Sequence, residues 1–116
     1  MTGADARERL ERQRAELARE LLAAEGALVE LRSARGDADG DDEHDPEGPT
    51  VSAQWSHARG IADSLRGRLE ETDAAVDRIE HGVYGTCVRC GRPIAPGRLD
   101  ARPSAELCID CASLGT

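Results

Sequence analysis

The 116-residue chain has no phenylalanine, one tryptophan and one tyrosine. Aromatic side chains supply much of the area that a globular core buries, so this chain has little with which to build a large core. Lysine is also absent, and every basic residue is an arginine. The net charge of −8 leaves no excess of basic surface with which to neutralise nucleic-acid phosphates. The composition therefore argues against a large globule and against direct binding to DNA.

Signals for export and for membrane insertion are missing too. Residues 1–14 are charged throughout and contain no apolar segment of the kind found in signal peptides. No run of about eighteen apolar residues is present that would span a bilayer. We therefore expect a cytoplasmic protein without membrane contact.

Cysteine is scarce but ordered. Four cysteines form two C-x-x-C pairs, Cys87 with Cys90 and Cys108 with Cys111, separated by seventeen residues. This spacing is typical of four thiolates that close tetrahedrally around one Zn²⁺. The alternatives are a redox dithiol, which needs only one pair within a βαβ pattern, and a disulfide scaffold, which needs an oxidising compartment. Neither context is visible, so the pattern predicts one structural Zn²⁺ with these four ligands.

Two stretches carry apolar residues at alternating spacings of three and four, which is the pattern of a coiled coil. The first stretch runs from Asp5 to Arg35 and the second from Val51 to Glu80. Positions of the first stripe are Leu10, Arg14, Leu17, Leu21, Ala24, Leu28 and Leu31. Positions of the second stripe are Val51, Trp55, Ala58, Ala62, Leu65, Leu69, Thr72, Val76 and Ile79. Each stripe predicts one long helix.

Residues 36–50 separate these helices and contain three glycines and two prolines, which predicts a turn. Folding back near residue 43 pairs Leu21 with Leu65 and Arg14 with Thr72; a shift by one heptad would also match the stripes. The predicted fold is mainly α, a long antiparallel two-helix coiled-coil hairpin with a small C-terminal four-cysteine zinc-finger knob. The expected domains are a hairpin over residues 1–80, with an acidic tip loop at 36–50, and a zinc finger over residues 81–116.

The tip loop is strongly acidic. Residues 37–47 hold seven carboxylates and no arginine. Such a run is often only a solvated turn, and the motif of an EF-hand calcium loop is incomplete here. At the tip of a hairpin, however, the same carboxylates can enter a narrow cavity of a partner and meet its basic residues or a bound Mg²⁺.

The C-terminal region resembles the DksA/TraR family of bacterial RNA polymerase regulators, most clearly over residues 78–111. The matching segments are Tyr84-Gly85-Thr86-Cys87, Cys90-Gly91-Arg92-Pro93-Ile94, Arg98-Leu99-Asp100-Ala101-Arg102-Pro103 and Leu107-Cys108-Ile109-Asp110-Cys111. The resemblance implies a non-enzymatic transcription regulator whose hairpin enters the secondary channel of RNA polymerase. It implies that two tip aspartates act near the catalytic centre, with Asp42 and Asp45 as the best fit and Asp39 and Asp42 as an alternative frame.

The resemblance also bears on guanosine tetraphosphate, the alarmone of the stringent response. Members that share an alarmone site with the polymerase place basic residues at three positions, which correspond here to Glu71, Arg102 and Ala112. Only Arg102 is basic in this chain. Arg102 is therefore the candidate contact for alarmone or polymerase, and we expect the chain to respond weakly or not at all to the alarmone through this site.

Two other functions stay open on the residues alone. The tip carboxylates could supply a second Mg²⁺ site to the polymerase and stimulate transcript cleavage. Alternatively, the knob could be a DNA-binding zinc ribbon that acts through Arg89, Arg92, Arg98 and Arg102. Acidic neighbours and the thiolates leave that knob with little net positive charge, which disfavours the second alternative.

Overall fold

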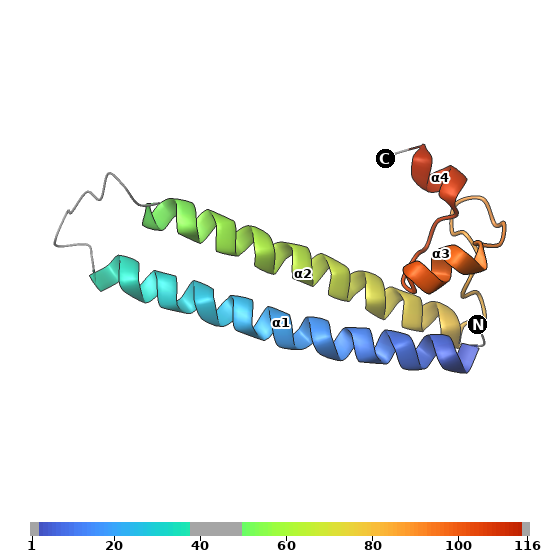
Figure 1. The fold of residues 1–116 in the computed structure, drawn as a ribbon, viewed down its shortest axis with the longest axis horizontal. Helices are drawn as coiled ribbons and strands as arrows, with labels where there is room; N and C mark the ends of the chain where they lie inside the picture. The colour runs from blue at the N-terminus through green and yellow to red at the C-terminus, as the bar shows by residue number, and fades with distance from the viewer. Residues whose placement is uncertain (1–2, 38–49, 115–116) are drawn as a thin grey trace. The chain divides into compact units, whose positions relative to one another are not determined.

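The computed structural model describes residues 3–37 and 50–114 of the chain. It contains two long helices, α1 (Gly3–Asp37) and α2 (Val51–Glu80), and two short ones, α3 (Pro96–Ala101) and α4 (Ile109–Ser113) (Figure 1). Within those ranges no strand forms, and one isolated bridge joins Thr86 and Pro93. The predicted fold class, mainly α with two long helices, is confirmed. Neither range contains a helix long and apolar enough to cross a membrane.

The boundaries of the long helices test the sequence patterns. Helix α2 has the bounds that the second stripe predicts. It begins directly after Thr50, whose side-chain oxygen accepts a hydrogen bond of 3.0 Å from the backbone N–H of Ala53, which is the geometry of a helix N-cap. Helix α1 continues to Asp37, so the expectation that the turn starts at Gly36 was wrong. A single glycine costs a helix only about 1 kcal/mol and does not end it by itself.

The chain forms two compact units, each with its own contacts. Unit 1 consists of Met1–Glu16 and Arg68–Thr116, and unit 2 consists of Leu17–Gly67. Each unit therefore contains part of both long helices, and the cysteines belong to unit 1.

In unit 2, the stripes of α1 and α2 face one another as predicted. Leu17, Leu28, Ala62 and Leu65 are buried. The arrangement is antiparallel, since Arg32 lies over the ring of Trp55 at 5.7 Å, while Glu25, earlier in α1, forms an ion pair of 2.9 Å with Arg66, later in α2. The remaining stripe positions of this unit are half-buried: Leu21, Ala24, Leu31, Val51, Trp55 and Ala58.

In unit 1, α1 and α2 also run side by side, with Ala6, Leu10, Thr72 and Ala75 fully buried between them. The register predicted from the sequence pairs Thr72 with Arg14.

The structure changes that one layer. Gln13, rather than Arg14, faces Thr72, and its amide Nε2 donates a hydrogen bond of 2.8 Å to Thr72 Oγ1. Arg14 is exposed and pairs with Asp73 instead. Both residues satisfy a spacing of three or four, and the neutral amide takes the inner position because burying a guanidinium costs much more free energy.

Candidate metal centre

The first cysteine pair lies on a turn held by backbone hydrogen bonds. Gly85 and Gly91 adopt φ values of 83° and 76°, a left-handed conformation that other residues rarely adopt. The N–H of Gly91 donates to the carbonyl of Cys87 at 2.9 Å, and the N–H of Cys87 donates to that of Arg92 at 2.8 Å. These bonds close a tight loop around Cys87 and Cys90.

The second pair is placed by a helix start. Cys108 is the N-cap residue of α4, and Cys111 lies within that helix. The N–H of Ala112 donates to the carbonyl of Cys108 at 2.9 Å, which fixes the two cysteines on one turn. The two loops are joined because the N–H of Val88 donates to the carbonyl of Glu106 at 2.9 Å.

The four sulfur atoms converge. All lie within 4.8 Å of one another, and the Sγ atoms of Cys90 and Cys108 are 3.7 Å apart. Zn–S bonds of about 2.3 Å in a tetrahedron put neighbouring sulfurs roughly 3.8 Å apart, so the cluster has the size for one Zn²⁺. Cys87 and Cys111 are buried, whereas Cys90 is exposed. With four thiolates the metal has no open position, which is the arrangement of a structural site.

The local environment shifts the pKa values of two of the thiols in opposite directions. Burial acts to raise the pKa of Cys87, but backbone N–H groups of Cys108, Cys90 and Arg89 hydrogen-bond to the sulfur and lower this pKa to about 6. Burial, together with the neighbouring thiols, raises the pKa of Cys111 to about 12. Without a cation, four converging thiols therefore resist becoming four thiolates. A divalent metal removes this conflict, because it replaces the protons and neutralises the thiolate charge.

The core behind the cysteines is small. Besides the three buried cysteines, it contains Ile94, Leu99 and Ala105, with Tyr84 and Leu107 packed against it. So few apolar residues bury little area, which makes the metal the main source of stability for this part of the chain.

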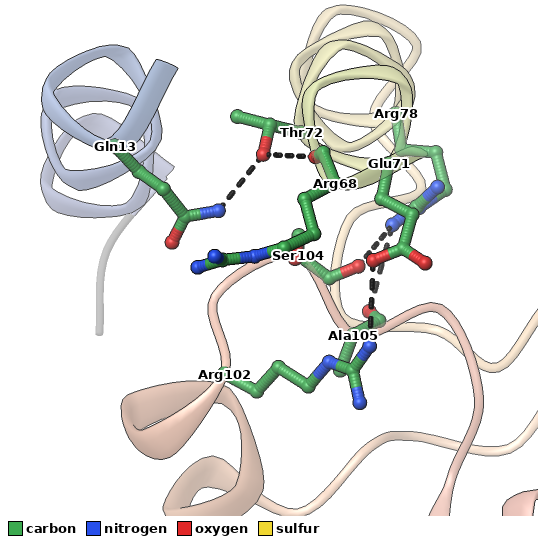
Figure 2. Close-up of polar contacts among 8 residues, drawn as sticks. All are labelled: Gln13, Arg68, Glu71, Thr72, Arg78, Arg102, Ser104 and Ala105. Carbon is green, nitrogen blue, oxygen red and sulfur yellow. Dashed lines mark hydrogen bonds and ion pairs between the residues drawn. The ribbon is translucent and has the colours of Figure 1, made fainter. Parts of the chain in front are cut away.

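Several side chains fix the segment between the cysteine pairs by donating to its carbonyl groups. Tyr84 Oη donates to Pro103 at 2.8 Å, Arg98 Nε to Leu107 at 2.8 Å, and Arg9 Nη2 to Asp100 at 2.6 Å. Arg78 approaches the carbonyls of Ser104 and Ala105 at 3.4 and 3.5 Å, as Figure 2 shows. Arg9 and Arg78 could not be identified from the sequence, since arginines that bind carbonyls far away in the chain leave no local pattern.

The other predicted site residues lie in different parts of the chain. Arg102 lies after α3, and its Nη2 forms an exposed ion pair of 3.3 Å with Glu71 of α2 (Figure 2). Ala112 and Glu71 line the same small cavity beside Arg102. The tip aspartates Asp42 and Asp45, and Asp39 of the alternative frame, lie outside the described residues.

Comparison with known proteins identifies the zinc-finger region. The family described as the prokaryotic dksA/traR C4-type zinc finger matches residues 82–114. An uncharacterized protein of Aquifex aeolicus is 34% identical over 77 residues, which cover 63% of this chain and 53% of that protein. The RNA polymerase-binding transcription factor DksA of Haemophilus influenzae is 38% identical over 52 residues, covering 45% and 36%. The chain thus spans about half or less of the length of these relatives.

Solved structures resemble the chain over most of its length. Transcription factor DksA2 from Pseudomonas aeruginosa matches with a TM-score of 0.77 and 27% identity, covering 97% of this chain and 81% of that one. The DnaK suppressor protein of Agrobacterium tumefaciens matches with a TM-score of 0.61 and 26% identity, covering 98% and 94%. Together with the four converging cysteines, these matches lead to one conclusion: residues 82–114 of the chain form a zinc finger of the prokaryotic dksA/traR C4 type.

Proposed function

We propose that this protein is a non-enzymatic transcription regulator that binds bacterial RNA polymerase and therefore acts in the cytoplasm. The observation that carries the proposal is the metal centre: residues 82–114 match the dksA/traR zinc finger, and relatives with this finger are named RNA polymerase-binding transcription factors. A site closed by four thiolates offers no open coordination position for chemistry, which supports a binding role over a catalytic one.

The proposed mechanism places the acidic loop in the secondary channel of the polymerase. In the sequence, this acidic segment lies between the end of α1 and the start of α2, two helices that run antiparallel in unit 2. We assign the effect on initiation to Asp42 and Asp45, whose carboxylates can interact with Mg²⁺ or with basic residues near the catalytic centre. Asp39 and Asp42 form the alternative frame.

The test combines binding and initiation assays with core and holoenzyme polymerase. Wild-type protein should bind core polymerase, and a plugged secondary channel should prevent this binding. Asp42→Ala with Asp45→Ala should abolish the change in initiation and leave binding largely intact. The matched control is Glu43→Ala with Glu47→Ala, which removes the same charge from the same loop. Equal effects of the two pairs would contradict a specific role for Asp42 and Asp45, and a stronger effect of Asp39→Ala with Asp42→Ala would favour the other frame.

We further propose that guanosine tetraphosphate acts weakly on this protein. Arg102 already forms an ion pair with Glu71, and the Ala112 side chain has no group to bind phosphate. Glu71→Lys with Ala112→Lys should make initiation respond more strongly to the alarmone, whereas Glu70→Lys with Ala112→Lys should not, because Glu70 does not line that cavity. A strong alarmone effect on the wild type that requires Arg102 would overturn the proposal.

Direct DNA binding is not part of the proposed function. Of the four knob arginines, Arg98 donates to the Leu107 carbonyl and Arg102 pairs with Glu71, so two guanidinium groups already have partners within the protein. A tight, salt-dependent complex with duplex DNA would contradict this view. Faster RNA shortening in a backtracked elongation complex would contradict the non-enzymatic role.

A further inference from the structure

A groove lies between α1 and α2 in unit 2, with a volume of about 260 Å³. Leu28, which is 9% exposed, and the half-buried Trp55 line it together with Val29. The Val29 side chain is 64% exposed, and position 29 does not belong to the stripe of α1 that faces α2. Aliphatic and aromatic surface thus remains accessible in a chain with very few aromatic residues.

A second exposed apolar side chain lies on α1. Leu22 is one heptad before Val29, on the same side of the helix, and is 72% exposed. Neither residue belongs to the stripe that faces α2. Exposed apolar side chains beside a groove are typical of a surface that another protein covers.

Three arginines, Arg32, Arg59 and Arg66, surround the groove, and Glu25 is the single acidic residue in its lining. Arg66 is fully engaged, because it forms ion pairs of 2.9 Å with both Glu25 and Asp63. These contacts make the Arg66 side chain part of the wall of the groove.

The guanidinium groups of the other two arginines form fewer ion pairs within the described residues. Among the described residues, Arg59 has one long ion-pair contact of 3.8 Å, with Asp63. Arg32 lies over the Trp55 ring, and no carboxylate of residues 4–33 or 50–114, whose side chains the structure describes, lies within ion-pair distance of its guanidinium. A guanidinium that an aromatic ring holds in place can accept a carboxylate with little loss of side-chain freedom.

We infer that this groove docks an acidic segment of a partner protein. The segment places an apolar side chain against Trp55 and Val29 and a carboxylate on Arg32. Charge complementarity selects this occupant, since the chain as a whole carries −8 and repels acidic surfaces except where arginines predominate. Tryptophan and arginine are also the residue types that most often dominate binding energy at protein interfaces. The inference rests on the proposed function, so the partner is core RNA polymerase.

The test compares affinities for core polymerase between groove variants and matched controls. Arg32→Glu and Val29→Asp should each weaken binding about tenfold or more. Arg19→Glu makes the same charge change on an exposed arginine of α1 outside the groove, and Ile61→Asp makes the same polarity change at an exposed apolar residue of α2 outside the groove. Both controls should stay within about twofold of wild type. Circular dichroism confirms that each variant keeps its helix content.

A second readout uses the wild-type coding sequence. Trp55 is the only tryptophan of the chain. When it is replaced biosynthetically by 7-azatryptophan, it can be excited apart from the tryptophans of the polymerase. Acrylamide should quench this fluorophore several-fold less in the complex than in the free protein, because the partner covers the groove. Unchanged quenching in a complex that has formed would overturn the inference.

The outcomes separate the two proposals. If wild-type protein fails to bind core polymerase, the proposed function and the docking inference fall together. If wild type binds but Arg32→Glu and Val29→Asp match their controls, only the docking inference falls. Sedimentation of the free protein as a dimer that Arg32→Glu dissociates would assign the groove to a second copy of this chain and would likewise overturn the inference.

Discussion

Single side chains hold the segment between the cysteine pairs, because the core behind the metal is so small. Arg9, Tyr84 and Arg98 each donate to one backbone carbonyl of residues 100–107. A net contribution of about 1 kcal/mol per hydrogen bond is a large share of the stability of such a region. The geometry around the metal therefore depends on these donors as well as on the four thiolates.

Tyr84 makes one of these contributions depend on pH. Burial raises the pKa of its phenol, so the folded state favours the neutral form that donates to the Pro103 carbonyl. The contribution is fully present below the unfolded pKa of about 10 and is lost as pH rises through the folded pKa, since the unfolded chain gives up the proton first. Because the chain has one tyrosine, the ultraviolet absorbance of phenolate reports Tyr84 alone. The folded midpoint should lie above the midpoint in denaturant.

The control is Tyr84→Phe, which has no proton to lose. Its free energy of unfolding at neutral pH should be about 1 kcal/mol lower than that of wild type, and it should not show the alkaline decline that Tyr84 causes. A folded midpoint at or below the unfolded one would contradict the burial of the phenol.

Glycines give a second prediction at the residue scale. A Cβ atom at Gly26, Gly60 or Gly67 would meet nothing within 4 Å, so alanine at each position should raise the free energy of unfolding by about 0.5–1 kcal/mol. Gly85 has a φ of 83°, and its Cβ would lie 3.6 Å from Leu99 Cδ1. Gly85→Ala should therefore lower this free energy by about 1–2 kcal/mol. Urea denaturation measures both, and equal signs for Gly60→Ala and Gly85→Ala would contradict the conformations described here.

At the scale of elements, α2 could be predicted with its bounds because the heptad stripe is a local signal that fills Val51–Glu80. The structure adds the N-cap at Thr50, which is consistent with the start of that stripe. The end of α1 could not be predicted equally well, since Gly36 weakens a helix without ending it. The pairing of Gln13 with Thr72 was missed for another reason: spacings of three and four both fit the stripe, and only packing against α2 decides between Gln13 and Arg14.

At the metal centre, too, local structure could be predicted and contacts between distant residues could not. Its four cysteines could be predicted from their spacing, because each C-x-x-C pair lies on a short local structure. The arginines that bind carbonyls of residues 100–107 could not, since Arg9 and Arg78 come from α1 and α2. Contacts between residues so far apart in the chain depend on how α1 and α2 pack against the finger within unit 1.

The Gln13–Thr72 layer makes a prediction about the pairing of α1 with α2 in unit 1. Thr72 is fully buried, and its hydroxyl accepts from Gln13 and donates to the Arg68 carbonyl at 2.8 Å (Figure 2). A double-mutant cycle with Gln13→Ala and Thr72→Ala should give a coupling energy of about 0.5–1.5 kcal/mol in urea denaturation. The matched cycle replaces Gln13 with the exposed neighbour Arg12, whose partner is Glu8, and should give a coupling near zero. Similar coupling in both cycles would contradict a specific polar layer.

At the scale of the whole molecule, charge is concentrated in one segment. The chain has 23 acidic and 15 basic residues, and seven of the acids lie within residues 37–47. The other residues therefore carry 16 acids and 15 arginines, which is close to balance. Exposed ion pairs such as Arg7–Glu80 and Arg14–Asp73 use many of these groups and contribute little to stability individually. An acidic excess confined to the loop favours a role in binding over a general role in solubility.

Removal of zinc should lower the stability of the zinc-finger region in unit 1 and leave that of unit 2 largely unchanged. All four cysteines belong to unit 1, while the buried residues of unit 2, Leu17, Leu28, Ala62 and Leu65, do not depend on the metal. After chelation, backbone amides in residues 82–114 should exchange with deuterium much faster, because a core this small does not persist without its metal. Amides of Leu17–Gly67 within the two helices should keep most of their protection. Hydrogen exchange followed by mass spectrometry, with released zinc measured in parallel, provides the test.

Matched variants connect this loss to the ligands. Cys111→Ser should reduce bound zinc from one equivalent to nearly none and reproduce the fast exchange of residues 82–114, because a serine hydroxyl does not replace a thiolate ligand. Ser113→Ala, on the same short helix, removes only a hydrogen bond to the Ile109 carbonyl and should keep one zinc. Unchanged protection of residues 82–114 after the metal has been removed would show that packing and carbonyl hydrogen bonds suffice. In that case the zinc would not be the structural element that its four converging thiolate ligands indicate.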